Sequence, residues 1–317
     1  MEAKKIRRLL LAGLVLLVAG CITVKVSVFP EAGPLKEQVV SGHGRDKVLL
    51  LDVSGMILQG PRGWLHLTSA TTAARVKEEL DKAGKDDRVK ALVLRINSPG
   101  GTVSASDIIY HELMAFKEKK KAPVVACFLG LAASGSYYAA QAADTIIATP
   151  TGITGSIGVI AMKFNVKGLM DKIGVDPEMV KTGQWKDFWS PFKASTPKEK
   201  EMMQNIIDQF YQDFVEVVAK GRKQPVQVVR QWADGRVFTA KQALDLGLVD
   251  RVGYLDDAIA LAKDKAGIDE ESRVVRYRRE GTYKPTIYSM LPQLDPTSGL
   301  GPQFLYFWWP GELSPGF

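Results

Sequence analysis

The sequence predicts an α/β protein in which a mostly parallel sheet is flanked by helices, with a helical second half and an irregular C-terminal tail. Two observations predict this fold class. The short apolar segments are continuous rather than alternating, as in strands buried on both faces. Segments with helical periodicity separate them, which is typical of parallel strands joined by helices. The chain of 317 residues, 46% hydrophobic and 24% charged, is long enough for one or two globular domains.

Strands and helices are expected to alternate along the first half of the chain. Apolar runs predict strands at residues 48–53, 89–96, 123–128 and 145–148. Apolar periodicity predicts helices at residues 71–83 and 104–120, and small residues predict a further helix at 132–143. Residues 97–101, Asn-Ser-Pro-Gly-Gly, are expected to form a sharp turn after the second strand.

The second half is predicted to be mainly helical. Thr196, Pro197 and Glu199 form the pattern of an N-cap, a first-turn proline and a capping box. The apolar residues that follow mark one face of a long helix. Shorter helices are expected at 225–233 and 239–246, the second ended by a glycine.

The last 37 residues, 281–317, differ in character from the rest. They contain six prolines and eight aromatic residues, and this proline density predicts that they lack regular structure. The aromatic residues are too apolar for a solvated tail. The tail is expected to pack on its own domain, with a neighbouring subunit, the membrane interface or a peptide groove as alternatives.

The N-terminus has the pattern of an export signal. Residues 1–8 are basic, residues 9–20 form a short apolar run, and Val-Ala-Gly before Cys21 resembles a bacterial lipobox. This resemblance implies cleavage before Cys21 and lipid attachment to it, and an uncleaved anchor helix is the alternative. In both cases the rest of the chain is tethered to a bacterial membrane on its periplasmic side.

Charge and composition exclude several function classes. The net charge is +7, but residues 1–20 contribute +3 of it, and the remaining +4 is too small to argue for nucleic-acid binding. Three scattered histidines and two cysteines argue against a metal site or a disulfide framework. Cys127 lies in an apolar run and is expected to be a buried thiol. We therefore expect no metal or cofactor, and a catalytic base other than histidine.

Two small-residue segments have the potential to bind a developing negative charge. The turn that ends in Gly101 leaves backbone N–H groups uncovered. Ser134 opens a predicted helix, a position where serine usually acts as a cap. However, the N–H of Gly135 at that helix start is free to stabilise an oxyanion formed when Ser134 attacks a carbonyl.

Lys186 is the candidate base. An ordinary lysine is protonated at neutral pH and cannot accept a proton, but burial among aromatic residues favours the neutral amine. Trp185, Phe188 and Trp189 supply such neighbours. The carboxylate of Asp187 would oppose this effect, so we expect it to point away from the amine.

Together these motifs resemble the signal peptide peptidase A family of serine peptidases. The resemblance spans residues 48–266 and includes Pro-Gly-Gly after a strand, Ala-Ser-Gly at a helix start, Thr-Gly-Ser-Ile-Gly at 154–158 and Gly-x-x-Lys-Asp. It implies a ClpP/crotonase-like fold and a Ser/Lys dyad. The family pattern makes Ser134 the nucleophile and Lys186 the general base, with Ser156 orienting the lysine. It assigns the oxyanion amides to Gly101 and Gly135.

The sequence predicts an organisation into four parts, of which the resemblance covers only the peptidase domain, and the resemblance implies a function. The chain divides into a signal peptide (1–20), a tether (21–45), a peptidase domain (46–270) and a tail (271–317). Single-domain members form homo-oligomeric rings in which the serine and the lysine come from neighbouring protomers. The expected activity is a serine endopeptidase that cleaves hydrophobic peptides, such as released signal peptides, through an acyl-enzyme. A crotonase-like acyl-CoA enzyme and a non-catalytic membrane scaffold of the same fold are the alternatives.

Overall fold

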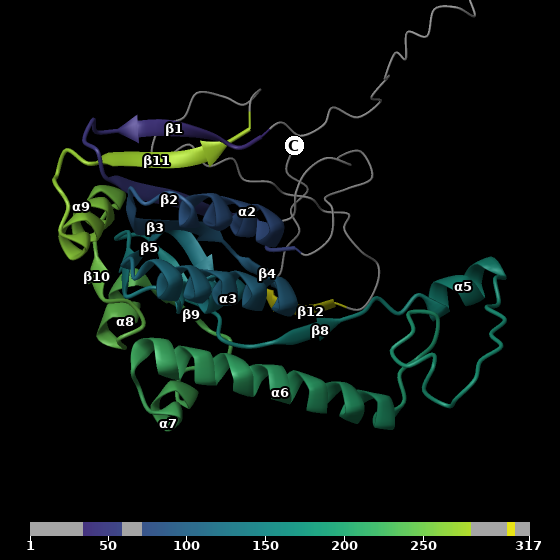
Figure 1. The fold of residues 1–317 in the computed structure, drawn as a ribbon. Helices are drawn as coiled ribbons and strands as arrows, with labels where there is room; N and C mark the ends of the chain where they lie inside the picture. Colours follow the sequence, from purple (N-terminus) through teal and green to yellow (C-terminus); the bar gives the residue numbers. More distant parts are fainter. Residues whose placement is uncertain (1–33, 59–71, 280–302, 308–317) are drawn as a thin grey trace, which may run out of the picture. The chain divides into compact units, whose positions relative to one another are not determined.

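A computed structural model describes residues 34–58 and 72–279 and the backbone of residues 303–307. The predicted export signal, Cys21 and most of the predicted tether lie outside these residues. Within them, the main sheet has the spatial order β1 (Lys36–Ser41), β11 (Arg273–Arg278), β2 (Lys47–Ser54), β3 (Val89–Ser98), β5 (Val124–Ala133), β6 (Thr145–Ala148) and β10 (Arg251–Val252) (Figure 1). Along this order every pair is parallel except β1 with β11. The mostly parallel sheet that the sequence predicts is therefore confirmed.

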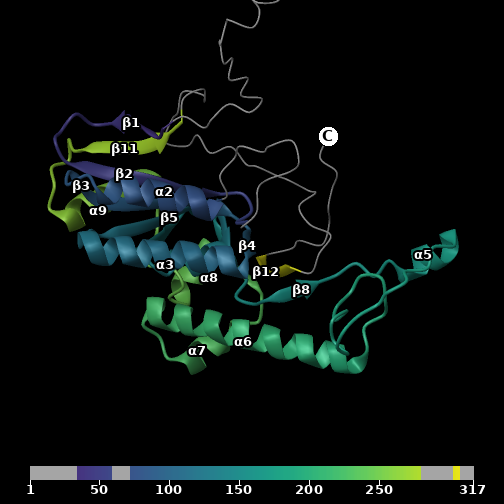
Figure 2. The same ribbon diagram turned by 45° about the vertical axis from the view of Figure 1, so that its right-hand side comes forward.

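Helices cover both faces of this sheet (Figures 1 and 2). On β2, Leu49 and Leu51 pack into the larger apolar cluster with α2 (Thr72–Gly84) and α3 (Val103–Lys120). The alternate residues Val48 and Leu50 pack with α9 (Leu255–Ala266) on the opposite face. Because both sets of alternating side chains are buried, the strands read as continuous apolar runs.

A long helix, α6 (Pro197–Arg222), begins as the sequence predicts. The Thr196 hydroxyl accepts a hydrogen bond from the Glu199 N–H at 3.2 Å, and the Glu199 carboxylate accepts one from the Thr196 N–H at 2.8 Å. The C-terminal half of α6 packs on the domain through Phe214 and Val218, which lie in the main core. Two short helices follow, α7 (Val226–Arg230) and α8 (Ala240–Asp245).

The structure differs from the sequence prediction at the end of β5. The predicted helix at 132–143 is only α4 (Gly135–Ala140), because β5 continues to Ala133. The last three residues of β5 pair with β7 (Ile153–Gly155), which in turn pairs with β9 (Val237–Thr239). Small residues are compatible with a helix or a strand. Residues 131–133 form a strand because they pair with β7, which lies about twenty residues further along the chain.

Both predicted irregular ends contain strands. Residues 36–41, expected in the tether, form the polar edge strand β1, which is paired with β11. The prediction that residues 281–317 lack regular structure is wrong at β12 (Gln303–Phe307). Pro302 and Pro310 flank this strand but none of its five residues is a proline, so its N–H groups are available for pairing.

Two ionisable groups in the core have pKa values that burial raises. Cys127 is fully buried, and burial raises the pKa of its thiol to about 12, so the expectation of a buried thiol is confirmed. Glu79 on α2 is also buried, and burial raises the pKa of its carboxyl to about 7 although Arg75 Nη1 lies 2.7 Å from its Oε1. The folded chain therefore holds a proton on Glu79 between about pH 4.5 and 7 that the unfolded chain has released.

Glu79→Gln should reduce the pH dependence of stability. Since the folded state binds the extra proton, the free energy of unfolding of the native chain falls as the pH rises through this window. The stability difference between the two proteins should change by about 3 kcal/mol between pH 4 and pH 8. Urea unfolding at both pH values measures it, and equal pH slopes for the two proteins would contradict the assignment.

Candidate active site

Ser134 lies at the sharp turn between β5 and α4. Its backbone has φ 56° and ψ −121°, a conformation that non-glycine residues rarely adopt and that costs conformational energy. Two bonds hold the turn: the Ser134 N–H donates to the Gly155 carbonyl at 2.8 Å, and the Tyr138 N–H donates to the Ser134 carbonyl at 2.9 Å. A strained strand-to-helix turn of this kind also holds the nucleophile of α/β-hydrolases.

The hydroxyl of Ser134 lacks a hydrogen-bond partner. Ser134 is 1% exposed, and its Oγ contacts no donor or acceptor within the described part of the chain. A buried hydroxyl without a partner is unfavourable and calls for an explanation. Gly135 follows as the first residue of α4, where N–H groups have no intrahelical acceptor.

Gly101, the last residue of the predicted turn, lies in the short strand β4 (Gly100–Thr102), and only Pro99 separates this strand from β3. The backbone of Ile57 bonds to both sides of Gly101: the Ile57 N–H donates to the Gly100 carbonyl, and the Thr102 N–H donates to the Ile57 carbonyl, both at 2.8 Å. A Cβ on Gly101 would lie 1.9 Å from the Ile57 oxygen, so only glycine fits.

Two serine side chains connect the Gly101 turn to the start of α4. The Ser136 hydroxyl donates to the Ser98 carbonyl at 2.8 Å, and the Ser98 hydroxyl accepts from the Gly100 N–H at 3.1 Å. Neither serine was predicted from the sequence to be part of the site. The only signal was their position beside the two glycine-rich turns.

Ser156 lies close to Ser134 through strand pairing. Its neighbour Gly155 is opposite Ala133 in the β5–β7 ladder, and the Ser156 N–H donates to the Arg236 carbonyl at 2.8 Å. Ser156 is buried and has φ 51°, a second strained serine. The structure therefore brings Ser134, Gly135, Ser156 and Gly101 together beyond the carboxyl end of β5.

Lys186 is not brought to this cluster. It lies between α5 (Lys167–Ile173) and α6, in a segment that extends away from the sheet beyond the first turns of α6 (Figures 1 and 2). Its side chain is exposed and makes no hydrogen bond or ion pair with any residue that the structure describes. One chain therefore presents Ser134 and Lys186 separately.

The segment around Lys186 is held by an ion-pair network. Asp187 binds Lys181 at 2.5 Å and Lys193 at 3.0 Å, and Lys193 also binds Glu199 at 2.8 Å. The hydrogen bonds from these two lysines lower the pKa of the Asp187 carboxyl to about 2. Asp187 therefore directs its charge to Lys181 and Lys193 and leaves the Lys186 amine free, in agreement with the sequence prediction.

We call residues 160–192 the arm. Helix α5 within it has no buried residue. Most of the large apolar side chains of the arm are solvent-exposed, and Val180 reaches 96% exposure. The exposed apolar residues of the arm are Ile160, Met162, Phe164, Leu169, Ile173, Val175, Met179, Val180, Trp185 and Phe192. Such a patch on a soluble surface is typical of a protein interface.

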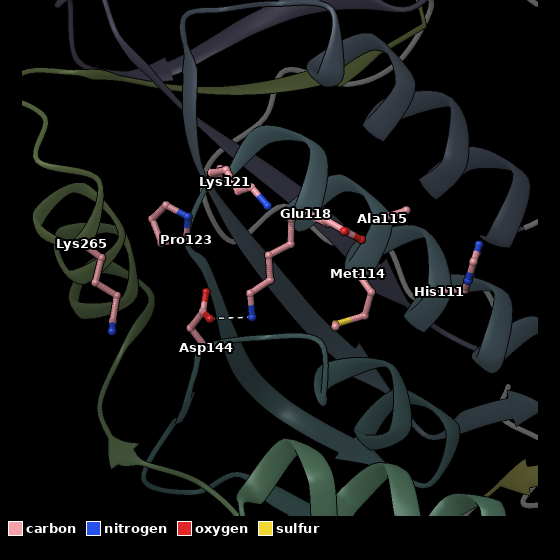
Figure 3. Close-up of a pocket in the computed structure, with 10 residues that line it drawn as sticks. His111, Met114, Ala115, Glu118, Lys121, Pro123, Asp144 and Lys265 are labelled. Atoms are coloured by element: carbon pink, nitrogen blue, oxygen red, sulfur yellow. Dashed lines mark ion pairs between the residues drawn. The ribbon is translucent and has the colours of Figure 1, made fainter.

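One hollow that the described residues form lies elsewhere. It encloses about 820 Å³ between α3, the start of β5 and Lys265 of α9, and Lys117 binds Asp144 across it at 2.5 Å (Figure 3). Pro123 and Asp144, at the amino ends of β5 and β6, line it, whereas Ser134 follows the carboxyl end of β5. Ten strand residues, up to about 30 Å, separate the two places, so this hollow is not part of the serine site.

Two kinds of feature are absent from the described part of the chain. Over residues 34–58 and 72–279, no three His, Cys, Asp or Glu side chains are grouped so that they could ligate a metal ion. Over the same residues, none of the helices has the length and apolarity that crossing a bilayer requires.

The chain is similar to known peptidase families and proteins. The model of peptidase family S49 matches residues 116–269, and the Clp protease model matches residues 66–152. A Synechocystis protein assigned as a protease is 40% identical over 227 residues, which are 72% of this chain and 77% of that protein. An Enterococcus faecium protein assigned as a signal peptide peptidase SppA is 36% identical over 248 residues, 78% of this chain and 71% of that protein.

A plant relative names the type of chemistry. The chloroplast serine protease SPPA of Arabidopsis thaliana is 36% identical over 251 residues, although this chain spans only 36% of its length. The Clp protease match and the parallel sheet flanked by helices identify the fold as ClpP/crotonase-like. The chain belongs to peptidase family S49, the signal peptide peptidase A family, and is a serine peptidase.

Proposed function

We propose that this protein is a membrane-tethered serine endopeptidase in which Ser134 of one protomer is activated by Lys186 of a neighbouring protomer. The observation that carries the proposal is the separation of the two groups. Ser134 Oγ is buried without a partner, and Lys186 is exposed without one among the described residues. Each group lacks what the other supplies.

The arm gives a reason for assembly. Its exposed apolar side chains would be buried against a second copy of the chain, and each buried side chain of this size contributes about 1.5–3 kcal/mol. Burial of the arm also removes water from around Trp185 and Lys186, which favours the neutral amine that a base requires. Assembly and activation are thus the same event.

The proposed chemistry is acyl transfer to Ser134. Neutral Lys186 accepts the Ser134 proton, and Ser134 Oγ attacks the peptide carbonyl carbon. The N–H groups of Gly101 and Gly135 bind the oxyanion, and Ser156 orients the lysine amine. The protonated amine then gives its proton to the leaving nitrogen. The C–N bond breaks, and the acyl group remains on Ser134 Oγ as an acyl-enzyme. Lys186 next takes a proton from water, and the resulting attack releases the acid and restores Ser134.

Substrate class and location rest on sequence and relatives. A lipobox ending in Cys21 supports a tether to the membrane on the periplasmic side, with an uncleaved N-terminal anchor as the alternative. A relative assigned as a signal peptide peptidase supports hydrophobic peptides as substrates. An acyl-CoA enzyme of the same fold is less well supported, because the paired serine and lysine have no role in holding an enolate.

A serine-reactive fluorophosphonate tests the proposal. Added to membranes from cells that produce the full chain, it should label this protein in the membrane fraction, and peptide mapping should place the label on Ser134. Ser134→Ala should not be labelled, while Lys172→Ala, which removes an exposed lysine of the same arm, should be labelled like the native chain. Peptide hydrolysis without Ser134 labelling, or turnover of an acyl-CoA instead, would refute the proposal.

A further inference from the structure

Strand β12 forms a small sheet, separate from the main one, with two short strands beside the candidate active site. It lies between β4 and β8 (Ile160–Met162) and is antiparallel to both (Figures 1 and 2). Leu305 is opposite Thr102 on one side and Ile160 on the other. Residues 303–307 thus lie beside the proposed catalytic groups.

The pairing of β12 with β4 bears on where a peptide substrate can bind. Ile57 occupies one edge of β4, so that the remaining edge is open to a further strand. β12 takes this edge, and Tyr306 lies opposite Gly101. Because Gly101 is the proposed oxyanion donor, a peptide that is to be cleaved must pass along the same edge.

The other neighbours of β12 point to the same region. β12 lies against α4, whose first residue follows Ser134. β8 begins four residues after Ser156. A backbone between β4 and β8 therefore runs past both serines and past Gly101. Extended peptides are commonly bound by adding a strand to an open sheet edge in this way.

The tail segment also has the chemistry of the proposed substrates. Gln303–Phe307 contains no charged residue and no proline, and three of its five residues are aromatic. A peptide of this composition binds through its backbone along a strand edge, with apolar side chains on both faces.

We infer that residues 303–307 occupy the peptide groove of the resting enzyme and compete with substrate, an inference that rests on the proposed function for the identity of the groove. Substrate must displace β12 before its carbonyl reaches Gly101. A tethered competitor acts at an effective concentration in the millimolar range, which weakens apparent substrate binding without changing the chemistry.

Leu305→Pro in the full chain tests the competitor. Proline removes the N–H of the central residue of β12 and cannot remain between two paired strands. We expect KM for a hydrophobic peptide to fall about tenfold with kcat unchanged. Ser298→Pro adds a proline outside β12 and should leave both constants unchanged. An unchanged or higher KM in Leu305→Pro, or an equal fall in Ser298→Pro, overturns the inference.

A binding measurement keeps this test separate from the proposed activity. A fluorescent peptide with the sequence Gln-Phe-Leu-Tyr-Phe should bind the chain that carries both Ser134→Ala and Leu305→Pro at least about tenfold more tightly than the Ser134→Ala chain. Equal binding overturns the inference even if the enzyme is a peptidase. If the native chain and the Leu305→Pro chain both fail to cleave any peptide while this difference in binding is still found, the proposed function is wrong. In that case the inference that residues 303–307 occupy a peptide groove is retained.

Discussion

Ser134→Ala is expected to lower kcat/KM for peptide hydrolysis by at least about 10³-fold, because the nucleophile of the proposed acyl-enzyme is lost. The fold should be unaffected. Ser134 Oγ donates to and accepts from no described residue, so its removal breaks no hydrogen bond. Alanine also meets the same backbone strain as serine at φ 56°. Activity on a fluorogenic hydrophobic peptide and thermal unfolding by circular dichroism measure the two effects separately.

Lys186→Ala should be as severe, since nucleophile and base act as one unit and the loss of either removes the pathway. Lys172→Ala removes the same charge from the same arm and serves as the matched control, with activity expected to be close to native. Substantial activity in Ser134→Ala or Lys186→Ala, or equal loss in Lys172→Ala, would show that the dyad is assigned wrongly.

The second large effect is expected from Gly101→Ala. Its Cβ would lie 1.9 Å from the Ile57 oxygen and 2.5 Å from the Ile57 carbonyl carbon, and both are backbone atoms that cannot rotate aside. β4 must shift, which displaces the Gly101 N–H from the oxyanion. Loss of one such donor lowers kcat by about 10²–10³-fold, so we expect at least this loss.

Stability has to be measured beside activity for Gly101→Ala, because the shift also strains the two bonds to Ile57. Gly168→Ala is the control: this glycine lies in α5 with open space around its Cβ position, and alanine there should be neutral or slightly stabilising. A Gly101→Ala protein that is folded and retains near-native kcat would show that the Gly101 amide does not bind the oxyanion.

The strands of the core could be predicted from the sequence because both faces of each strand are buried. A run such as that of β2 is apolar at every position and has no competing interpretation. β1 and β11 could not be predicted in the same way. β1 is a polar edge strand, and β11, which lies between β1 and β2, mixes arginines with apolar residues. Each is specified by a partner more than 200 residues away rather than by its own pattern.

The candidate site was predictable by residue type and only partly by geometry. Gly101, Ser134 and Ser156 lie in segments that the sequence motifs marked. The positive φ of both serines was not predictable, because serine has no preference for that conformation and strand pairing around β7 imposes it. The separation of Lys186 follows from the length of α6, whose N-terminal half continues beyond the packed core and carries the arm with it.

The most direct test of the shared dyad is to mix two inactive chains. Ser134→Ala and Lys186→Ala chains are co-expressed in equal amounts with different tags, and assemblies that contain both are purified through the two tags in turn. If the dyad forms between protomers, about one quarter of the sites combine an intact Ser134 with an intact Lys186, and the mixture should recover about a quarter of native activity. If Ser134 and Lys186 act within one chain, no site is complete, and a co-assembled but inactive mixture would contradict the proposal.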